Sequence, residues 1–576
     1  MKYFFAIAVV MLSILAMGCS SGIPVPTTTP RALPEYVSGL PHESRQASWQ
    51  YELDGATVYA ASAGTTVSGN ELEITAPPDG VAWAVYELGL PSPLSVPVSL
   101  NLELSSGSGD YWVGLSDYRD SEAWEWHGPY GGSTAIAPWA DGGKYVSGAG
   151  NTYWAVAAVA GTSITVSASR MNQVMVTYVN SPGIGEIALR IDEPEQERFS
   201  GVGAPVCFVA NGWFIPQSGF DQTTFTDLGV ITVSCLWPGL GDPGTGARSD
   251  GVDDYGGPDA LAAMRDALRF ACGETSDVNG NYLADLVSVT TLYDNAGLYA
   301  FSHPGVVATN VIAHHGTEFE LAWFIGRENP TSDEQYPLEI GYWNDDGSLN
   351  THPYYRYPED YSPTQLDVDY SAAGWVVDPV EYPEGRPCLT RPDSTLHVFG
   401  YKGPKINGVR YFSRGLTQAL EANNVFGADP WPEDVATYAE VAAFWPERVA
   451  VNNYPAIGTN HPDLKVMLVF AADDHVQAAL DKPHVHQAWD GFSTGAGLTW
   501  VRLNPDKSYL ELFSPTAALP YTEHDANTQP GDWLTIRQWG YDGTKANGTV
   551  AGKVAVAEMV DRAYSGNWDP DVPGVL

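Results

Sequence analysis

Basic residues are scarce in this chain of 576 residues. Lysine and arginine together number 28, against 69 aspartates and glutamates, which gives a formal net charge of −41 at pH 7. A surface this acidic repels the phosphates of nucleic acids and anionic lipid headgroups, so nucleic acid is not an expected partner. The excess fits either an ordinary solvated surface or adaptation to high salt, and the sequence leaves both open.

Cysteine is sparse as well, with five in the whole chain. Apart from one near the N-terminus, they are Cys207, Cys235, Cys272 and Cys388. Their spacing fits neither a disulfide scaffold nor a zinc motif. Cys207 and Cys235 stand in apolar runs typical of buried strands, so unpaired core thiols are at least as good an interpretation as disulfides.

Long hydrophobic runs are lacking beyond the N-terminus. Residues 3–17 are apolar but too few to span a bilayer comfortably, and their basic start and small-residue end are typical of a secretory signal. The run closes on Ala16-Met17-Gly18-Cys19, which resembles a bacterial lipobox, with Leu15 four residues before the cysteine instead of three. We expect residues 1–19 to direct export, giving a lipoprotein anchored through Cys19 at the cell surface or in the periplasm. Ordinary cleavage and secretion is the alternative.

The next segments indicate a tether and an all-β domain. Residues 20–47 are rich in proline, threonine and serine and have no evident means of burying a core. Residues 48–170 contain short alternating apolar stretches between turn residues, which predicts a β-sandwich. Within it, period-two alternation places Trp124 and Trp126 on one sheet face. They could stack on sugar rings, but we interpret them as part of the sandwich core.

Residues 171–576 change to strands that alternate with helices. Residues 205–210 and 229–234 are continuous apolar runs, as expected for strands covered on both faces. A helix is predicted to open at Pro258 and to stop at Gly273. This alternation predicts an α/β domain with a mostly parallel sheet.

One serine stands in a sharp turn between a predicted strand and a predicted helix. Residues 297–300 indicate a buried strand, Ser302 follows almost at once, and Pro304 suits the first turn of a helix that should end at His314-His315-Gly316. The turn would hold Ser302 at the carboxyl edge of the strand and at the positive end of the helix dipole.

This segment resembles the nucleophile elbow of the α/β-hydrolases, whose usual motif is G-x-S-x-G. Ala300 and Pro304 occupy the two glycine positions here, with Gly305 one residue further on. The resemblance extends over about 400 residues at the level of fold, with similarity to prolyl-oligopeptidase-type peptidases and dienelactone-hydrolase-like esterases. It implies an α/β-hydrolase fold with a lid insertion at about residues 335–445.

The resemblance also implies a Ser-His-Asp triad in the chain order Ser302, Asp474, His524. The acid follows the predicted strand 466–470, where Asp473 is an alternative, and the histidine follows the predicted strand 498–503. His524 would take the serine proton, and the aspartate would fix the histidine tautomer.

The oxyanion-hole donors implied by the same resemblance are backbone N–H groups. One belongs to His303, directly after the nucleophile, and the other to Trp213 or Phe214, after the strand 205–210. The expected reaction is hydrolysis of a small-molecule ester or a peptide, with esterase and peptidase both open. The alternative is a non-catalytic surface protein whose sandwich binds a glycan or a partner.

A weaker pattern places oxygen side chains at alternate positions, as in a calcium loop. Its members are Asp277, Asn279, Asn281 and Asp285. Glycine is missing at the sixth position, and Ser288 stands where a bidentate glutamate belongs. A turn rich in Asp and Asn is the better interpretation, and we expect no other metal or cofactor.

Overall fold

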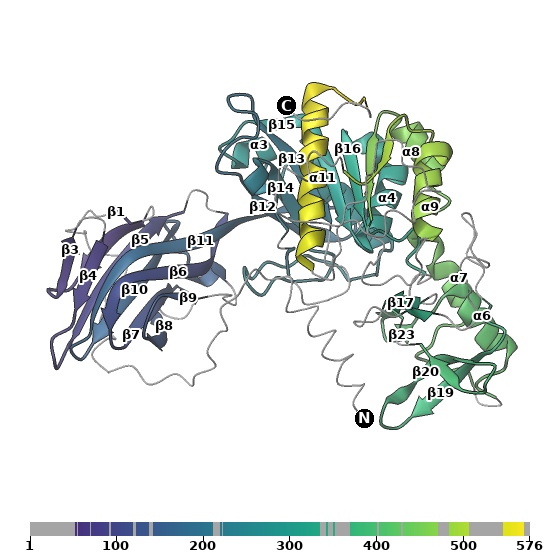
Figure 1. The fold of residues 1–576 in the computed structure, drawn as a ribbon, viewed down its shortest axis with the longest axis horizontal. Helices are drawn as coiled ribbons and strands as arrows, with labels where there is room; N and C mark the ends of the chain where they lie inside the picture. The colour runs from purple at the N-terminus through teal and green to yellow at the C-terminus, as the bar shows by residue number, and fades with distance from the viewer. Residues whose placement is uncertain are drawn as a thin grey trace. The chain divides into compact units, whose positions relative to one another are not determined.

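The computed structural model describes most of the chain beyond residue 51. The described residues are 52–53, 56–68, 71–90, 94–118, 123–136, 142–210, 219–221, 223–334, 341–343, 349–351, 369–399, 403–427, 430–470, 483–505 and 545–569. They fall into two compact units, Met1–Thr177 with Gly241–Arg248 and Tyr178–Leu240 with Ser249–Leu576. Each unit has its own architecture (Figure 1).

The first unit consists of antiparallel strands in two sheets. One sheet has the order β1-β2-β5-β10-β7-β8, and the other contains β3, β4, β11, β6 and β9. The strands are β1 (Glu52–Leu53), β2 (Ala56–Ala61), β3 (Thr65–Ser68), β4 (Glu71–Thr75), β5 (Val81–Gly89), β6 (Ser95–Ser108), β7 (Tyr111–Asp117), β8 (Ala123–Tyr130), β9 (Thr134–Ile136), β10 (Asn151–Val159) and β11 (Ser163–Ser181). The two sheets share a core to which every second residue of the inner strands contributes.

The core of this unit centres on Trp154 of β10. Its indole stacks on Tyr86 of β5, with ring centroids 5.4 Å apart, and both rings are fully buried. The indole N–H donates to Ser169 Oγ of β11 at 2.8 Å, which satisfies the one polar group of the ring across the two sheets.

The paired indoles of β8 share one face, as predicted, but that face is not the sandwich core. In the antiparallel register of β8 with β7, Trp126 lies opposite Gly114 and Trp124 lies opposite Ser116. The alternate residues of β7, Val113 and Leu115, point into the core. The indoles therefore pack on the outer face of the six-stranded sheet, in a second cluster with Tyr153 and others. The prediction of a core position was wrong because the alternation alone fixes a shared face but not which face is inside.

The second unit is built on a mostly parallel sheet with the order β12-β14-β13-β15-β16-β24-β25. Its strands are β12 (Gly185–Asp192), β13 (Ala204–Ala210), β14 (Ile231–Cys235), β15 (Thr291–Phe301), β16 (Trp323–Arg327), β24 (Lys465–Val469) and β25 (Val501–Leu503). β12 is antiparallel to β14, and the other neighbouring pairs are parallel. Every residue of β13 is buried, as predicted for a strand covered on both faces.

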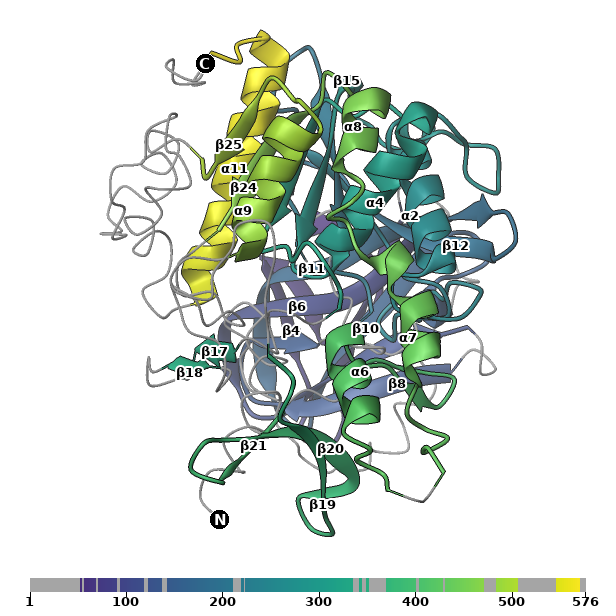
Figure 2. The same cartoon turned by 90° about the vertical axis from the view of Figure 1, so that its right-hand side faces the viewer.

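Helices cover both faces of this sheet (Figure 2). They are α2 (Pro258–Ala271), α3 (Leu283–Leu286), α4 (Pro304–His315), α8 (Tyr454–Asn460), α9 (Pro483–Asp490) and α11 (Lys545–Ser565). α2 opens at Pro258 and ends before Gly273, whose φ is 78°, so the prediction for this helix is confirmed. α2 and α4 lie on one face, and α11 lies on the other.

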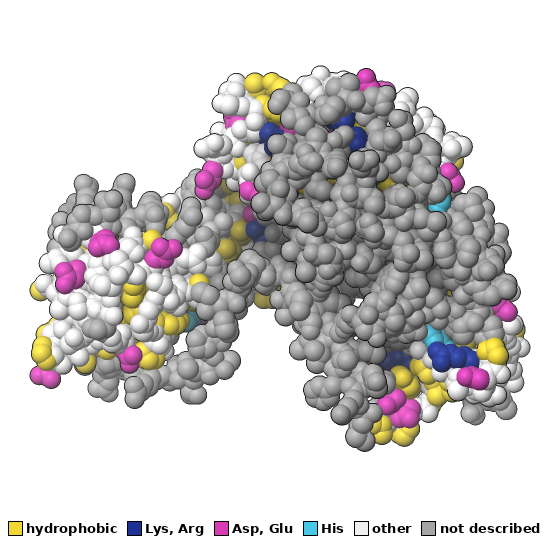
Figure 3. Space-filling view, in the orientation of Figure 1, with side chains coloured by type: hydrophobic (Ala, Val, Ile, Leu, Met, Phe, Trp, Pro, Cys, Tyr) yellow, Lys and Arg dark blue, Asp and Glu magenta, His cyan; other side chains and the backbone are white. Residues whose placement is uncertain are grey.

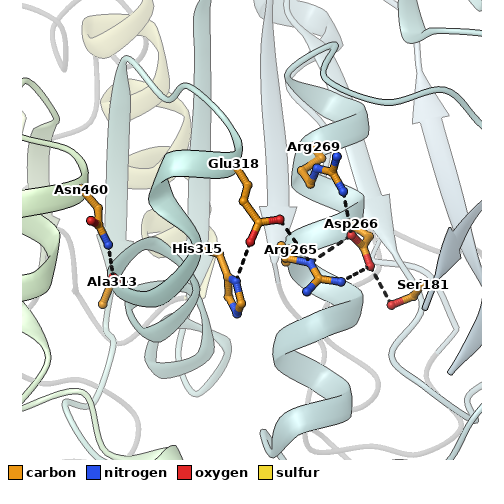
Figure 4. Close-up of polar contacts among 8 residues, drawn as sticks. All are labelled: Ser181, Arg265, Asp266, Arg269, Ala313, His315, Glu318 and Asn460. Atoms are coloured by element: carbon orange, nitrogen blue, oxygen red, sulfur yellow. Dashed lines mark hydrogen bonds and ion pairs between the residues drawn. The ribbon is translucent and has the colours of Figure 1, made fainter. Parts of the chain in front are cut away.

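Polar contacts join the helices of the first face (Figure 4). Arg265 of α2 pairs with Asp266 at 2.7 Å and lies 3.8 Å from Glu318, which also contacts His315 at the end of α4. The buried Asp266 accepts a hydrogen bond from Ser181 at 2.8 Å. These contacts connect the end of β11 with α2 and α4.

The last helix, α11, carries a buried charge network. Glu558 Oε1 accepts hydrogen bonds from Arg502 of β25 at 2.9 Å and from Arg562 at 2.7 Å, and all three side chains are at most 2% exposed. One carboxylate thus compensates two buried guanidinium groups. The network fixes α11 against the edge of the sheet.

An insertion lies between β16 and β24. Its elements are β17 (Gly341–Trp343), β18 (Leu349–Thr351), β19 (Ala373–Asp378), β20 (Tyr382–Thr390), β21 (Leu396–Val398), β22 (Lys405–Ile406), β23 (Val409–Arg410), α6 (Arg414–Ala422) and α7 (Tyr438–Phe444). Part of it has its own small core around Leu389 and Leu420. The two ends of the insertion meet in an antiparallel bridge between Ser332 and Val449.

Three further features bear on the sequence-based expectations. Cys207, Cys235, Cys272 and Cys388 are all unpaired, and burial raises the pKa of each thiol. Among the described helices, none combines the length and the apolar character needed to cross a bilayer. Asp and Glu side chains are scattered over the described part of the face in Figure 3 instead of gathering in one patch.

Candidate active site

Ser302 occupies the turn between β15 and α4 in a left-handed backbone conformation. Its φ is 61°, a region that L-residues other than Asn and Asp rarely adopt. Its N–H donates to the carbonyl of Arg327 at 2.9 Å, and its own carbonyl accepts from Gly305 at 3.0 Å. The predicted strand-to-helix turn is confirmed, and the surrounding hydrogen bonds hold the serine in a strained conformation.

The helix that follows the serine is central to the unit. α4 begins at Pro304, whose missing N–H is not needed in the first turn, and ends before Gly316, as predicted. Its side chains from Pro304 to Ala313 are buried. Ser302 itself is partly exposed, so it lies at the positive end of a buried helix dipole with access to solvent.

The first turn of α4 is tightly packed against the loop after β16. A Cβ built on Gly305 would lie 2.0 Å from the side-chain amide of Asn329, so only glycine fits there. Gly305 lies one residue beyond the second glycine position of the motif that the sequence resembles, and its missing side chain lets the loop after β16 approach the helix.

The carboxyl ends of neighbouring strands meet beside Ser302. In the parallel registers, Ala210 of β13 lies opposite Ala300 of β15. On the other side of β15, Phe301 lies opposite Arg327 of β16, which in turn lies opposite Val469 of β24. The segments that carry the other candidate residues therefore leave the sheet at this edge, where ligands of open α/β sheets bind.

Several predicted site residues lie outside the described part of the chain. They are Cys19, Trp213, Phe214, Asp473, Asp474 and His524. Their assignments as lipidation site, oxyanion donors, acid and base stay predictions. Of the predicted set, Ser302 and His303 are described and adjoin each other at the turn.

Special backbone conformations gather at the same edge. Glu328, directly after β16, has a φ of 49°, and Asn504, directly after β25, has a φ of 62°. With Ser302, three described strands of the sheet thus end on a non-glycine residue with positive φ. Asn adopts this region readily, but Ser and Glu rarely do, and strained residues such as Ser302 and Glu328 cluster at functional sites.

The sequence reasoning missed the loop after β16, residues 328–334, which we term the β16 loop. Its buried polar side chains are Glu328, Asn329, Thr331, Ser332, Asp333 and Glu334. Burying polar groups is costly without compensation. The signal that could have indicated it is a run of polar residues directly after a buried strand.

The β16 loop contributes an acid–histidine contact beside the nucleophile. Asp333 Oδ1 lies 3.7 Å from His303 Nε2, with the carboxylate fully buried and the imidazole 7% exposed. Burial raises the pKa of the Asp333 carboxyl well above its usual range, against the opposing effect of the Arg448 guanidinium. Burial therefore disfavours the charged form of this carboxyl beside His303, the residue directly before α4.

The calcium-like pattern forms a turn whose oxygens serve as hydrogen-bond acceptors within the chain. Asp277 Oδ1 accepts from the N–H groups of Asn279 at 2.9 Å and Asn281 at 2.8 Å, and Asp285 Oδ2 accepts from Tyr282 at the start of α3. Within the described residues, no group of three or more His, Cys, Asp or Glu side chains is arranged to hold a metal ion.

No protein-family model matches the chain, and no curated protein matches it in sequence. Among solved structures, it is similar to prolyl oligopeptidase B from Galerina marginata at 9% identity and a TM-score of 0.32, over 88% of this chain and 51% of that one. It is also similar to an esterase from Pseudomonas putida at 11% identity and a TM-score of 0.30, over 67% and 82%. A fungal esterase from Rhizomucor miehei has 15% identity and a TM-score of 0.21, over 28% and 46%. The chain spans about half the length of the first of these structures.

Proposed function

We propose that the protein is a serine hydrolase of the α/β-hydrolase type that cleaves an ester or amide bond through an acyl-Ser302 intermediate. The observation that carries this proposal is the conformation of Ser302, with a φ of 61° between the carboxyl end of β15 and the N-terminus of α4. A strained serine in that turn is the mark of the nucleophile elbow. The strand order around β15 supports the same assignment.

In the proposed reaction, His524 removes the Oγ proton as Ser302 attacks the substrate carbonyl carbon. Asp474 orients the imidazole and stabilises the imidazolium. The N–H of His303 and an N–H of Trp213 or Phe214 stabilise the oxyanion. The intermediate collapses as the imidazolium protonates the departing alcohol or amine. Water, deprotonated by the same histidine, then hydrolyses the acyl-serine and restores the enzyme.

Hydrolysis of chromogenic substrates tests the proposal and separates its two branches. We expect wild-type protein to cleave p-nitrophenyl esters or peptide p-nitroanilides, and Ser302→Ala and His524→Ala to lower kcat by about 10⁴-fold or more. The faster substrate class defines an esterase or a peptidase. Cleavage that is unchanged in Ser302→Ala would disprove the mechanism.

The acid needs its own comparison, because two adjacent aspartates follow the predicted strand. We expect Asp474→Asn to lose most activity and Asp473→Asn to keep it, since the order of residues after the strand favours the second aspartate. Loss of activity in Asp473→Asn alone would transfer the role to that residue.

The export and anchoring of the protein are proposals of the same kind. The N-terminal run and Cys19 support a lipid-anchored protein. Metabolic labelling with a palmitate analogue in a bacterial host would mark the wild-type chain and not Cys19→Ala, whereas equal labelling of both would exclude this anchor.

A second candidate function is glycan binding by the first unit. The outer face of the six-stranded sheet carries Trp83, Trp124 and Trp126 together with Tyr153, and Tyr153 donates to Glu87. Aromatic rings beside polar groups suit sugar rings, which have apolar faces and hydroxyl edges. Affinity electrophoresis through polysaccharide gels would show retardation that Trp126→Ala abolishes, and equal migration with and without polysaccharide would exclude it.

A further inference from the structure

The β16 loop connects the turn at Ser302 with the insertion, and among its buried polar side chains Thr331, Ser332 and Glu334 have hydrogen-bond or ion-pair partners. Glu334 forms an ion pair with Arg414 of α6 at 2.9 Å. Thr331 donates to Gln487 of α9 at 2.6 Å. These contacts offset the free-energy cost of burying the two side chains, and they fix the loop to α6 and to α9.

Asp333 differs from its neighbours in the loop. Its side chain is fully buried, and neither carboxyl oxygen accepts a hydrogen bond from any residue in the described part of the chain. Among the described residues, its closest ion-pair contact is with His303 Nε2 at 3.7 Å, and the Arg448 guanidinium offsets only part of the effect of burial on its pKa. A buried carboxyl with so little compensation costs stability, and such groups in native proteins are commonly retained for function.

The backbone of His303 is restrained on both sides. It stands between Ser302, held at positive φ, and Pro304, which fixes the start of α4. A small rotation of the peptide plane before His303 would change the direction of its N–H, the proposed oxyanion donor. Contact between the imidazole and Asp333 restrains that rotation from the β16 loop.

We propose that Asp333 is a positioning residue, which holds the His303 imidazole and thereby directs the His303 N–H at the carbonyl oxygen of the substrate. This inference rests on the proposed function. The burial that raises the pKa of Asp333 supports it, because a higher pKa disfavours a full negative charge beside the developing oxyanion. The backbone N–H of Asp333 donates to the carbonyl of Arg448 at 3.1 Å, so the returning end of the insertion sets the position of this residue.

The test compares Asp333→Ala and Asp333→Asn with wild type on p-nitrophenyl butyrate. Oxyanion donors contribute about 10²–10³-fold to kcat, and supporting residues that orient an active group contribute about 10–100-fold. We expect Asp333→Ala to lower kcat about 10–100-fold with KM within about twofold. Asp333→Asn should recover most of the loss, because a neutral amide of the same shape can keep the contact with the imidazole. The matched control, Asp192→Asn, alters another largely buried carboxyl with a raised pKa, three strands from β15, and should leave kcat unchanged.

A second variant keeps the test informative if Asp333→Ala fails to fold. His303→Ala removes the ring with all its contacts but keeps the backbone donor, so it should reduce kcat at least as much as Asp333→Ala. The double variant should lose no more than His303→Ala alone, since that change already removes the contact with Asp333. Additive losses would show that the two side chains act independently and would overturn the inference.

Other outcomes separate this inference from the proposed function. Wild-type kcat in Asp333→Ala, with Ser302 still reacting, would overturn the positioning role and leave the hydrolase intact. A loss in Asp333→Asn as deep as in Ser302→Ala would mean that the charged carboxylate itself is required, which also overturns it. A wild-type protein that never reacts at Ser302 would refute the proposed function and, with it, the role of Asp333.

Discussion

Replacement of Ser302 by glycine is expected to stabilise the protein while it removes the nucleophile. A side chain in the left-handed region costs about 1–2 kcal/mol, and glycine avoids this cost. Glycine loses more freedom on folding, which costs about 0.5–1 kcal/mol. Ser302→Gly should therefore exceed Ser302→Ala in free energy of unfolding by about 1 kcal/mol, since alanine keeps the Cβ but lacks the hydroxyl.

Urea unfolding followed by tryptophan fluorescence measures this difference, because Trp323 is fully buried on β16, the strand next to β15. The control is Ala300→Gly, two residues earlier and within β15, where φ is not positive. At that position glycine relieves no backbone strain, and the variant loses a buried methyl group, so it should be less stable than wild type. If Ser302→Gly is no more stable than Ser302→Ala, the elbow is not strained.

Three further predictions concern packing and charge. Glu558→Ala removes the carboxylate that the buried guanidinium groups of Arg502 and Arg562 share, so it should lower the free energy of unfolding in urea by about 3–5 kcal/mol. Wild-type stability would mean that the network contributes nothing. Gly305→Ala drives a Cβ into the Asn329 amide and should cost about 1–3 kcal/mol in the same assay and slow the reaction at Ser302, and an unchanged variant would contradict this packing. Burial lowers the pKa of His461 from 6.5 to about 4, which favours its neutral form, so its contribution is complete above pH 6.5 and is lost as pH falls to 4. That loss is about 3 kcal/mol in the free energy of unfolding. In urea titrations, His461→Phe should therefore show a difference in stability between pH 7 and pH 4 that is smaller than the wild-type difference by this amount. An equal difference in both proteins would refute the effect of burial on His461.

The local part of the candidate site could be predicted from sequence. A strand, a serine and a proline within a few residues specify a turn, and the turn at Ser302 follows from that order alone. The helix that opens at Pro258 is predictable for the same reason, because its signals are contiguous. Contacts between residues close in sequence leave their pattern in the sequence.

Tertiary features left no comparable pattern. The role of Asp333 depends on β16 lying next to β15 and on the bridge between Ser332 and Val449, two pairings that no local signal specifies. The predicted core position of Trp126 was wrong for a related reason. Alternation shows that two residues share a face of the sheet, but only the packing of the neighbouring strands decides which face is buried. The acid and base of the triad lie outside the described residues and stay predictions.

The most direct test of the central claim is the reaction of the protein with a fluorophosphonate, which modifies activated serines. The proposed function predicts one modified peptide, with the added mass on Ser302, and no labelling in Ser302→Ala or after denaturation. Substitution of His524 should slow the labelling strongly, because the serine then lacks its base. Equal labelling of wild type and Ser302→Ala, or no labelling of native protein, would contradict the assignment of Ser302 as the nucleophile.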